Sequence, residues 1–350
     1  MLSKKQSGLF VEVGDFSILV AQVNSLDGPL VIESLKSFPR SEDLSHLQAF
    51  AAPLVERKTP RFLMAHCGIL PPSRFIRRHS IESAAKAKDP KYLEEVVTQQ
   101  FRIDARQNKT AVINAVDGAE FSLDRPITAQ KELLFAGAKT VEISGLQSLL
   151  VKSHIYPRSL QLAPVCSLGA MQDYLRWKKY EEPVLIVDLG RKNGHAYIAS
   201  RNQVDFTRPL EVGVDSVVPQ IQAELGLKDE ESARKLLNSN TFDFTEMGSA
   251  LLRKVLKELQ AAIGFFEVQT GLGLTHIHVL NVPDNLRWVP NTLAKSLGHQ
   301  PLPMELVPWL NARDIRLAPE VAAIGAESRW FGLYSLMGNF SNKGDGAKEK

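Results

Sequence analysis

The sequence predicts an α/β fold in which a core of strands and helices occurs twice. The stretch Val184 to Gly213 has an apolar run that ends in Asp188-Leu189-Gly190, an Asn193-Gly194 turn and a second, alternating strand, which is a strong hairpin pattern. Gly8 to Val23 repeats this order with Glu12-Val13-Gly14. A strand, acid, glycine and hairpin that recur after about 175 residues indicate a duplicated core. Alternating strands and helices in both halves predict two sheets.

The bulk composition is that of a soluble globular protein with more than one compact unit. The 350 residues are 44% hydrophobic and 23% charged, and the net charge is +3 without a basic run, which argues against a nucleic-acid-binding surface. No apolar stretch reaches the roughly 20 residues that cross a bilayer. The basic segment Met1 to Ser7 precedes apolar residues interrupted by Glu12 and Asp15, unlike a signal peptide. Cys67 and Cys166 lie in apolar surroundings, which predicts reduced thiols and a cytoplasmic location.

In the first half, residue patterns predict strands and helices in alternation. Ser144 is the predicted N-cap of a helix that ends near Ile155, before Pro157. The other predicted elements are strands Leu9–Val13, Ser17–Val23, Leu30–Ser37, Arg61–Cys67, Thr110–Val116, Lys131–Ala138 and Arg158–Leu162, and helices Leu44–Val55, Tyr92–Phe101 and Pro164–Lys179.

The second half follows the hinge predicted at Glu181-Glu182-Pro183. A third strand is predicted at Val204 to Val212, with a bend or bulge at Arg208-Pro209. The polar end of the chain from Asn339 is predicted to be disordered. The remaining predicted elements are helices Asp215–Leu225, Glu230–Leu237, Phe244–Thr270, Val289–Leu297 and Pro319–Leu333, and strand Ile277–Leu280.

From Gly8 to Trp330 the order of segments resembles the actin-like ATPase superfamily, and within it the PilM proteins of type IV pilus assembly. Phe206 to Gly213 resembles the third strand of the second half. Arg74 to His79 resembles the first strand of the extra subdomain of PilM relatives, and Leu93 to Phe101 its helix. The resemblance implies a duplicated, ribonuclease-H-like fold with two half-domains and a PilM/FtsA-type inserted subdomain.

The resemblance also implies a division of the chain into subdomains. Residues 1–70 and 144–182 would form the first half-domain core, 71–143 the inserted subdomain, 183–214 and 271–336 the second core, 215–270 its small subdomain, and 337–350 a disordered tail.

By the resemblance, a nucleotide site with Mg²⁺ would use two loops, each with a carboxylate and glycines. Its residues would be Glu12, Gly14, Asp15 and Ser17 in the first loop and Asp188, Gly190 and Gly213 in the second, with Glu12 and Asp188 on Mg²⁺. Several positions depart from the family pattern. Asp15 would bring a negative charge toward a triphosphate, at a cost on the order of several kcal/mol in a partly dry cleft.

Other departures remove hydroxyls, a catalytic acid and glycines. Phe16 and the pair Arg191-Lys192 stand where relatives carry Ser and Thr, although Arg191 and Lys192 could also bind phosphate. Ala163 stands where relatives place the Glu that orients water, and Asn281 to Asn285 replaces a Gly-Gly-rich adenosine loop. These changes predict a pseudo-ATPase without catalytic residues, ATP or a metal.

The resemblance implies a cytoplasmic scaffold, peripheral to the inner membrane, in a type IV pilus or type II secretion-like complex. Its partner would be a PilN-like inner-membrane protein whose short N-terminal segment binds between the first half-domain and the inserted subdomain. Self-association stays open. Two alternatives remain: an active ATPase or nucleotide-gated switch that uses Glu12 and Asp188 on Mg²⁺, and an FtsA-like polymerising membrane tether.

Two further patterns carry structural interpretations. His276 and His278 alternate on one face of a strand, a spacing that can bind metal, but ordinary strand histidines are favoured because no third ligand is near in sequence. Trp330-Phe331-Gly332-Leu333-Tyr334 is interpreted as the packed end of the last helix rather than a membrane contact.

Overall fold

The computed structural model describes residues 8–341, except 27, 57–58, 90 and 240. Its chain forms two compact units, of which the first comprises residues up to Arg74, Ala138–Ala170 and those from Met304 onward, and the second Phe75–Gly137 and Met171–Pro303. Within the described residues, no helix is both long and apolar enough to cross a membrane.

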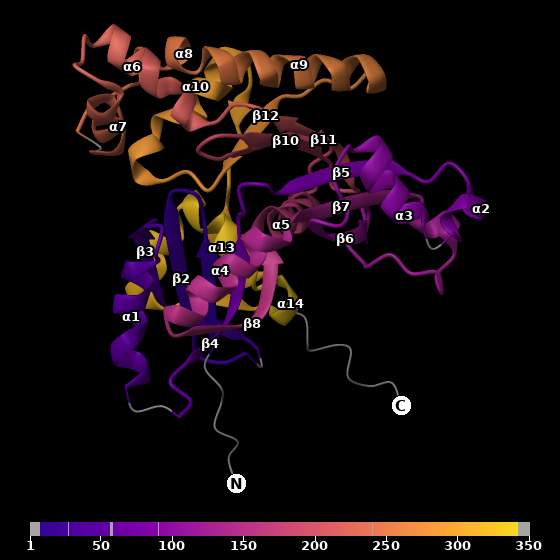
Figure 1. Cartoon of the computed structure of the whole chain (residues 1–350), viewed down its shortest axis with the longest axis horizontal. Helices are drawn as coiled ribbons and strands as arrows, with labels where there is room; N and C mark the ends of the chain where they lie inside the picture. The colour runs from indigo at the N-terminus through magenta and orange to yellow at the C-terminus, as the bar shows by residue number, and fades with distance from the viewer. Residues whose placement is uncertain (1–7, 27, 57–58, 90, 240, 342–350) are drawn as a thin grey trace. The chain divides into compact units, whose positions relative to one another are not determined.

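The first unit is built on a six-stranded mixed sheet in the order β14-β3-β2-β1-β4-β8. Figure 1 labels β2, β3, β4 and β8 of this sheet. Hairpin β1–β2 is antiparallel, and β4 and β8 then add in parallel. The strands are β1 Gly8–Val13, β2 Ser17–Val23, β3 Leu30–Pro39, β4 Leu63–Ile69, β8 Ile155–Leu162 and β14 Ile315–Leu317.

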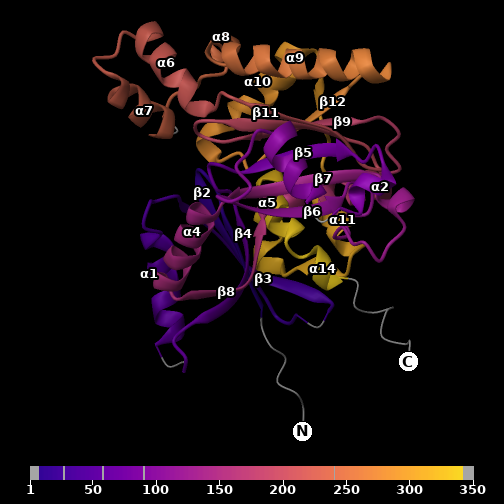
Figure 2. The same cartoon turned by 45° about the vertical axis from the view of Figure 1, so that its right-hand side comes forward.

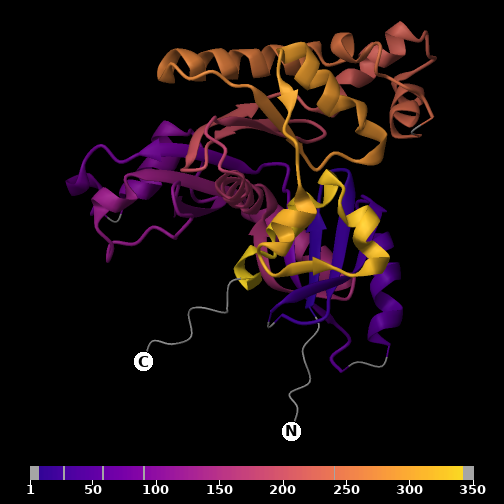
Figure 3. The ribbon, with the colours of Figure 1, turned by 180° about the vertical axis from the view of Figure 1, so that it is seen from behind.

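Helices cover both faces of this sheet. Helices α1 (Ser45–Val55) and α4 (Thr140–Lys152) pack on one face, where their apolar side chains join those of β1, β2 and β4 in a buried core. The C-terminal segment crosses the other face, where α13 contacts β1 and β2 (Figure 3). That segment consists of α11 Leu306–Asn311, β14, α12 Ala322–Gly325, α13 Phe331–Ser335 and α14 Gly338–Ser341.

The second unit contains two sheets (Figure 2). A five-stranded sheet has the order β11-β10-β9-β12-β13, and a three-stranded sheet has the order β5-β7-β6. The two meet where the Arg78 amide of β5 donates to the Thr207 hydroxyl of β11. The strands are β5 Phe75–Ser80, β6 Asn108–Asn114, β7 Glu132–Lys139, β9 Val184–Leu189, β10 Gly194–Ala199, β11 Val204–Leu210, β12 His276–Leu280 and β13 Gln300–Pro301.

The second unit's helices cover its sheets, and the long helix α9 lies against β11. A π-helical turn, Val96–Gln100, continues α3, so the predicted helix Tyr92–Phe101 is present but wound differently at its end. The helices are α2 Ala84–Ala87, α3 Tyr92–Glu95, α6 Val218–Glu224, α7 Glu230–Ser239, α8 Gly248–Leu251, α9 Arg253–Thr270 and α10 Trp288–Leu297. Helix α5 (Ala163–Lys178) begins in the first unit and ends in the second.

The predicted start of α4 was wrong. The helix begins at Thr140, directly after β7, and Ser144 lies inside it, where its carbonyl accepts a bond from the Ser148 hydroxyl. The stop signal predicted at Pro157 is also wrong, since Pro157 lies within β8. Strand β8 is at the edge of its sheet, where a residue without an N–H is tolerated.

Other predicted boundaries also needed correction. The predicted bulge at Arg208-Pro209 is absent from the described ladder, whose register shifts instead next to Ile198 and Ala199. The predicted helix Phe244–Thr270 is split into α8 and α9, and the predicted helix Pro319–Leu333 into short helical turns. Gly338–Ser341 is helical, and the rest of the predicted disordered tail lies outside the described residues.

Candidate functional site

The first loop joins β1 to β2, and the loop and the two strand ends beside it carry four of the predicted site residues. Glu12 is almost fully buried in β1, between Leu19 of β2 and Gly68 of β4. The Gly14 amide donates to the Ser17 carbonyl at 2.9 Å and closes a tight turn. Glu12 is therefore held in place by its strand, and a backbone hydrogen bond closes the turn that follows it.

Asp15, at the tip of this loop, forms an ion pair with Arg74. Its carboxylate lies 3.4 Å from the Arg74 guanidinium, which also donates to the Pro71 carbonyl at 3.2 Å. The Arg74 side chain is only 1% exposed, whereas that of Asp15 is 18% exposed. A buried guanidinium needs an anion nearby, and the loop supplies it.

A second polar contact fastens the same stretch to α4. The Glu142 carboxylate accepts hydrogen bonds from the Ser73 amide at 2.9 Å and the Ser73 hydroxyl at 2.7 Å. That hydroxyl in turn accepts a bond from the Lys139 amide. Asp15 and Glu142 thus hold adjacent residues, Arg74 and Ser73, just before β5 begins.

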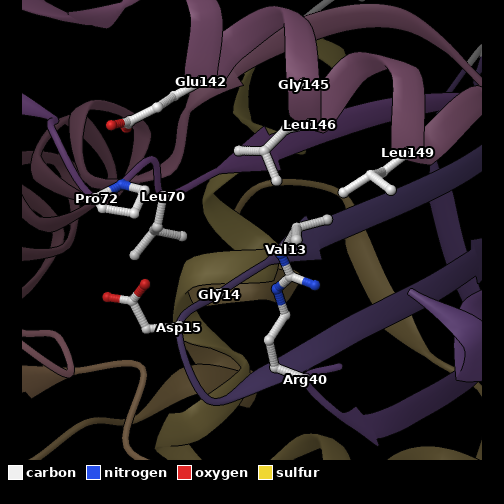
Figure 4. Close-up of a pocket in the computed structure, with 10 residues that line it drawn as sticks. All are labelled: Val13, Gly14, Asp15, Arg40, Leu70, Pro72, Glu142, Gly145, Leu146 and Leu149. Atoms are coloured by element: carbon white, nitrogen blue, oxygen red, sulfur yellow. The ribbon is translucent and has the colours of Figure 1, made fainter. Parts of the chain in front are cut away.

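A pocket of about 260 Å³ lies between this loop and α4 (Figure 4). Its apolar surface comes from the ends of β1 and β4 and from one face of α4, with Glu142 and Asp15 on one side and Arg40 on the other. Gly145 leaves a gap on α4, because a Cβ there would meet no atom within 4 Å. The lining residues are Val13, Gly14, Asp15, Arg40, Leu70, Pro72, Glu142, Gly145, Leu146 and Leu149.

Helix α5 approaches Glu12 from within the first unit. Ala163, fully buried, is its first residue, so the position where the resemblance implies a water-orienting carboxylate carries a methyl group. Cys166 lies further along the helix, and its pKa is raised to about 12 by burial and then by the charge of Glu12. Burial also raises the pKa of Cys67 to about 12. Both thiols are therefore protonated and unreactive near neutral pH.

The second loop joins β9 to β10; Asp188 lies in the strand before it and Gly190 is its first residue. Asp188 is buried at the end of β9, opposite His195 of β10, and its carboxylate lies 4.0 Å from Nδ1 of that histidine. The Gly190 amide donates to the Asn193 carbonyl at 2.9 Å. As in the first unit, an acid on a strand leads into a turn that closes on itself.

Gly213 packs directly against this second loop. A Cβ on Gly213 would lie 2.4 Å from the Arg191 carbonyl oxygen, so only glycine fits there. The amides of Val214 and Asp215 donate to the carbonyls of Gly190 and Arg191, at 2.9 and 2.8 Å. The first N–H groups after Gly213 are thus bonded to protein rather than exposed to an anion.

Charged side chains of the second loop are held within their own unit. The Asp215 carboxylate lies 3.7 Å from the Arg191 guanidinium and 3.2 Å from that of Arg234. Lys192 is exposed. The predicted site residues of the first loop therefore lie close together in the first unit, and those of the second loop lie close together in the second unit.

The expected adenosine loop and the histidine pair His276 and His278 lie in and directly after β12. Asn281 follows the strand in the left-handed conformation (φ 55°), and Asp284–Leu286 forms a short 3₁₀ turn where the resemblance implies a glycine-rich loop. His276 bonds the Tyr180 hydroxyl at 3.1 Å, and burial lowers the pKa of His278 to about 4. Among the described residues, no group of three or more His, Cys, Asp or Glu side chains could hold a metal ion.

The residues around the pocket were not predicted from the sequence as a site. Arg74 is expected from the sequence only as the first residue of the strand that begins the inserted subdomain, and neither Glu142 nor Arg40 stands in a recognisable motif. Arg74 is 59 residues from Asp15 and Ser73 is 69 from Glu142, so no local pattern joins these pairs. The sequence shows only that Arg74 directly precedes the apolar pair Phe75-Ile76, which does not by itself predict a buried side chain.

No family model matches the sequence, and no curated protein matches it. In structure, the chain is similar to a chain of a PilM-PilN type IV pilus biogenesis complex, with a TM-score of 0.68 and 15% identity over 95% of this chain and 98% of that one. The actin-like fold with an inserted subdomain, of the PilM type, is thereby confirmed.

Two other solved structures match with lower scores. One is a Bacteroides thetaiotaomicron protein with an actin-like ATPase fold and unknown function, with a TM-score of 0.44 and 9% identity over 95% of this chain and 96% of that one. The other is the cytoplasmic domain of EpsL, an inner-membrane component of the Vibrio cholerae type II secretion system, with a TM-score of 0.42 and 9% identity over 88% and 94%.

Proposed function

We propose that this chain is a cytoplasmic scaffold of a type IV pilus or type II secretion-like inner-membrane complex. It binds the N-terminal segment of a PilN-like partner, stays peripheral to the membrane through that partner, and does not hydrolyse ATP. The observation that carries the proposal is the similarity to a chain of a PilM-PilN complex over nearly the full length of both chains.

The geometry of the first loop supports a role without nucleotide. The guanidinium of Arg74 neutralises the Asp15 carboxylate, so this carboxylate does not need a bound cation. A triphosphate would bring negative charge toward Asp15 and compete for its guanidinium partner. With Ala163 at the start of α5, this unit also lacks a carboxylate to orient water at that position.

The second loop supports the same conclusion. Phosphate-binding loops present free backbone N–H groups to the anion. Here the Gly190, Val214 and Asp215 amides donate to protein carbonyls. Glu12 and Asp188 remain as two carboxylates on rigid strands, but the loops beside them do not fit Mg²⁺ with a triphosphate.

We place the docking site for the partner segment in the pocket between the first loop and α4. An extended segment needs apolar side-chain pockets and a few fixed polar groups. Leu70, Leu146 and Leu149 supply the apolar surface, and Arg40 lies across from Glu142 and Asp15. These carboxylates are already bonded to Arg74 and Ser73, so the polar edge of the pocket is rigid before a ligand arrives.

A nucleotide titration tests the part of the proposal that excludes a nucleotide-dependent activity. Fluorescent ATP with Mg²⁺ is added to the full chain, and melting is followed in parallel, since a ligand at a hundredfold excess over its Kd stabilises by about 2.7 kcal/mol. The proposal predicts neither saturable binding nor a shift of Tm at millimolar ATP. Saturable binding lost in Asp188→Asn would establish a nucleotide site and contradict it.

A further inference from the structure

We infer that the outward face of α9 binds an anionic lipid surface. This inference does not depend on the docking function, because α9 and the pocket lie in different units. The buried side of α9 packs on its own unit through residues such as Val255, Leu259 and Phe266. Most residues on its opposite side are exposed.

The C-terminal part of this face exposes apolar side chains. Val268 is 88% exposed, Phe265 is 49% exposed, and Leu272, two residues beyond the end of the helix, is 52% exposed. Gly271 ends the helix with a positive φ of 69°, and its amide donates to the Glu267 carbonyl. Apolar side chains this exposed within eight residues of one another are unusual for a surface that faces only water.

The N-terminal part of the same face is basic. Arg253, Lys254 and Lys257 are exposed, and Lys257, Ala261, Gly264 and Val268 follow one another at helical spacing of three and four. Within the described part of the chain, none of the three basic side chains forms an ion pair with a carboxylate. Glu258, one turn from Lys254 on the same helix, is half-buried and forms no ion pair with them among the described residues, so the three basic side chains outnumber the carboxylates in this part of α9.

This combination fits a lipid surface better than a folded partner. Basic residues beside exposed apolar ones on one side of a helix are typical of segments that lie in the membrane interface, with lysines on the headgroups and apolar side chains below them. Val268 protrudes rather than lining a hollow. A protruding side chain enters the headgroup boundary directly, whereas a folded protein would need a matching cavity.

Vesicle co-sedimentation of the full chain tests the inference. We expect it to sediment with phosphatidylglycerol vesicles, not with phosphatidylcholine vesicles, and to be released at high salt, because screening weakens contacts with anionic headgroups. The double variants Val268→Ser/Leu272→Ser and Lys254→Glu/Lys257→Glu should each lower the partition coefficient about tenfold or more. Melting curves should show that both variants fold, since all four side chains are exposed.

Matched controls make the result specific to α9. Leu123→Ser removes another exposed apolar side chain, and Lys86→Glu/Lys88→Glu makes the same change of charge elsewhere. Both controls should retain binding. The inference is overturned if the wild type does not bind phosphatidylglycerol vesicles, or if the controls weaken binding as much as the α9 variants. It is equally overturned if the α9 variants abolish self-association or partner binding and leave vesicle binding intact.

Discussion

The guanidinium of Arg74 lies 3.4 Å from the carboxylate of Asp15 and links the tip of the first loop to the residue that precedes β5. By the resemblance to actin-like ATPases, this loop would face the phosphates of a nucleotide. Here its acid binds a cation of the same chain. The loop thus helps to shape a pocket whose other wall is α4.

Removal of Arg74 tests whether this ion pair is structural. Arg74→Ala leaves Asp15 without its guanidinium and should destabilise the protein by about 1–3 kcal/mol, less than a fully buried pair because Asp15 is partly exposed. A double-mutant cycle with Asp15→Ala, read from urea unfolding, should give a coupling of about 1 kcal/mol. Additive effects would show that the two side chains do not stabilise each other.

A substitution at Gly213 tests whether the second loop packs closely against this residue. Gly213→Ala places a methyl group 2.4 Å from the Arg191 carbonyl and should cost about 1–3 kcal/mol, or displace the loop. Gly264→Ala is the control, because its Cβ meets nothing within 4 Å and alanine favours the helix by up to about 1 kcal/mol. Equal melting temperatures for the two variants would mean that the loop does not pack on Gly213.

His278 predicts a dependence of stability on acid pH. Burial lowers the pKa of His278 to about 4, below the value of about 6.5 in the unfolded chain. Above pH 6.5 the group is neutral in both states and contributes nothing. As pH falls from 6.5 to 4 only the unfolded chain gains the proton, so stability decreases, by as much as about 3 kcal/mol.

The measurement for His278 is a series of melting curves between pH 7.5 and 4.5. His278→Gln should lose less stability than the wild type over this range, whatever its stability at pH 7.5. If the two proteins lose stability in parallel, His278 is not the group responsible.

Gly145 tests the pocket as a docking site. Gly145→Leu extends a side chain into the open space on α4, and we expect the chain to fold normally and to lose at least tenfold in affinity for the partner segment. Gly169→Leu is the control, since it adds the same side chain at an open, exposed position of α5. Fluorescence anisotropy of a labelled partner peptide measures both. Unchanged affinity in Gly145→Leu would exclude the pocket.

Much of the fold followed from local patterns, whereas the site did not. The β9–β10 hairpin was predictable because an apolar run, Asn193-Gly194 and renewed alternation specify both strands and turn. The start of α4 was not, because Ser144 has the chemistry of a cap but the helix continues from β7. The partner of Asp15 was out of reach as well, since a contact between residues 59 apart exists only after the chain has folded.

Binding of the partner segment in the presence and absence of nucleotide tests the central claim most directly. A labelled peptide of the N-terminal segment of the PilN-like protein from the same organism is titrated with the full chain, with and without about 5 mM Mg-ATP. This concentration exceeds the KM of most enzymes, which reaches about 1 mM. We predict saturable binding with a Kd that is the same, within about twofold, under both conditions, because the loops are complete without ATP. Absence of binding, or a Kd that ATP changes tenfold or more, would contradict the account of a nucleotide-independent scaffold.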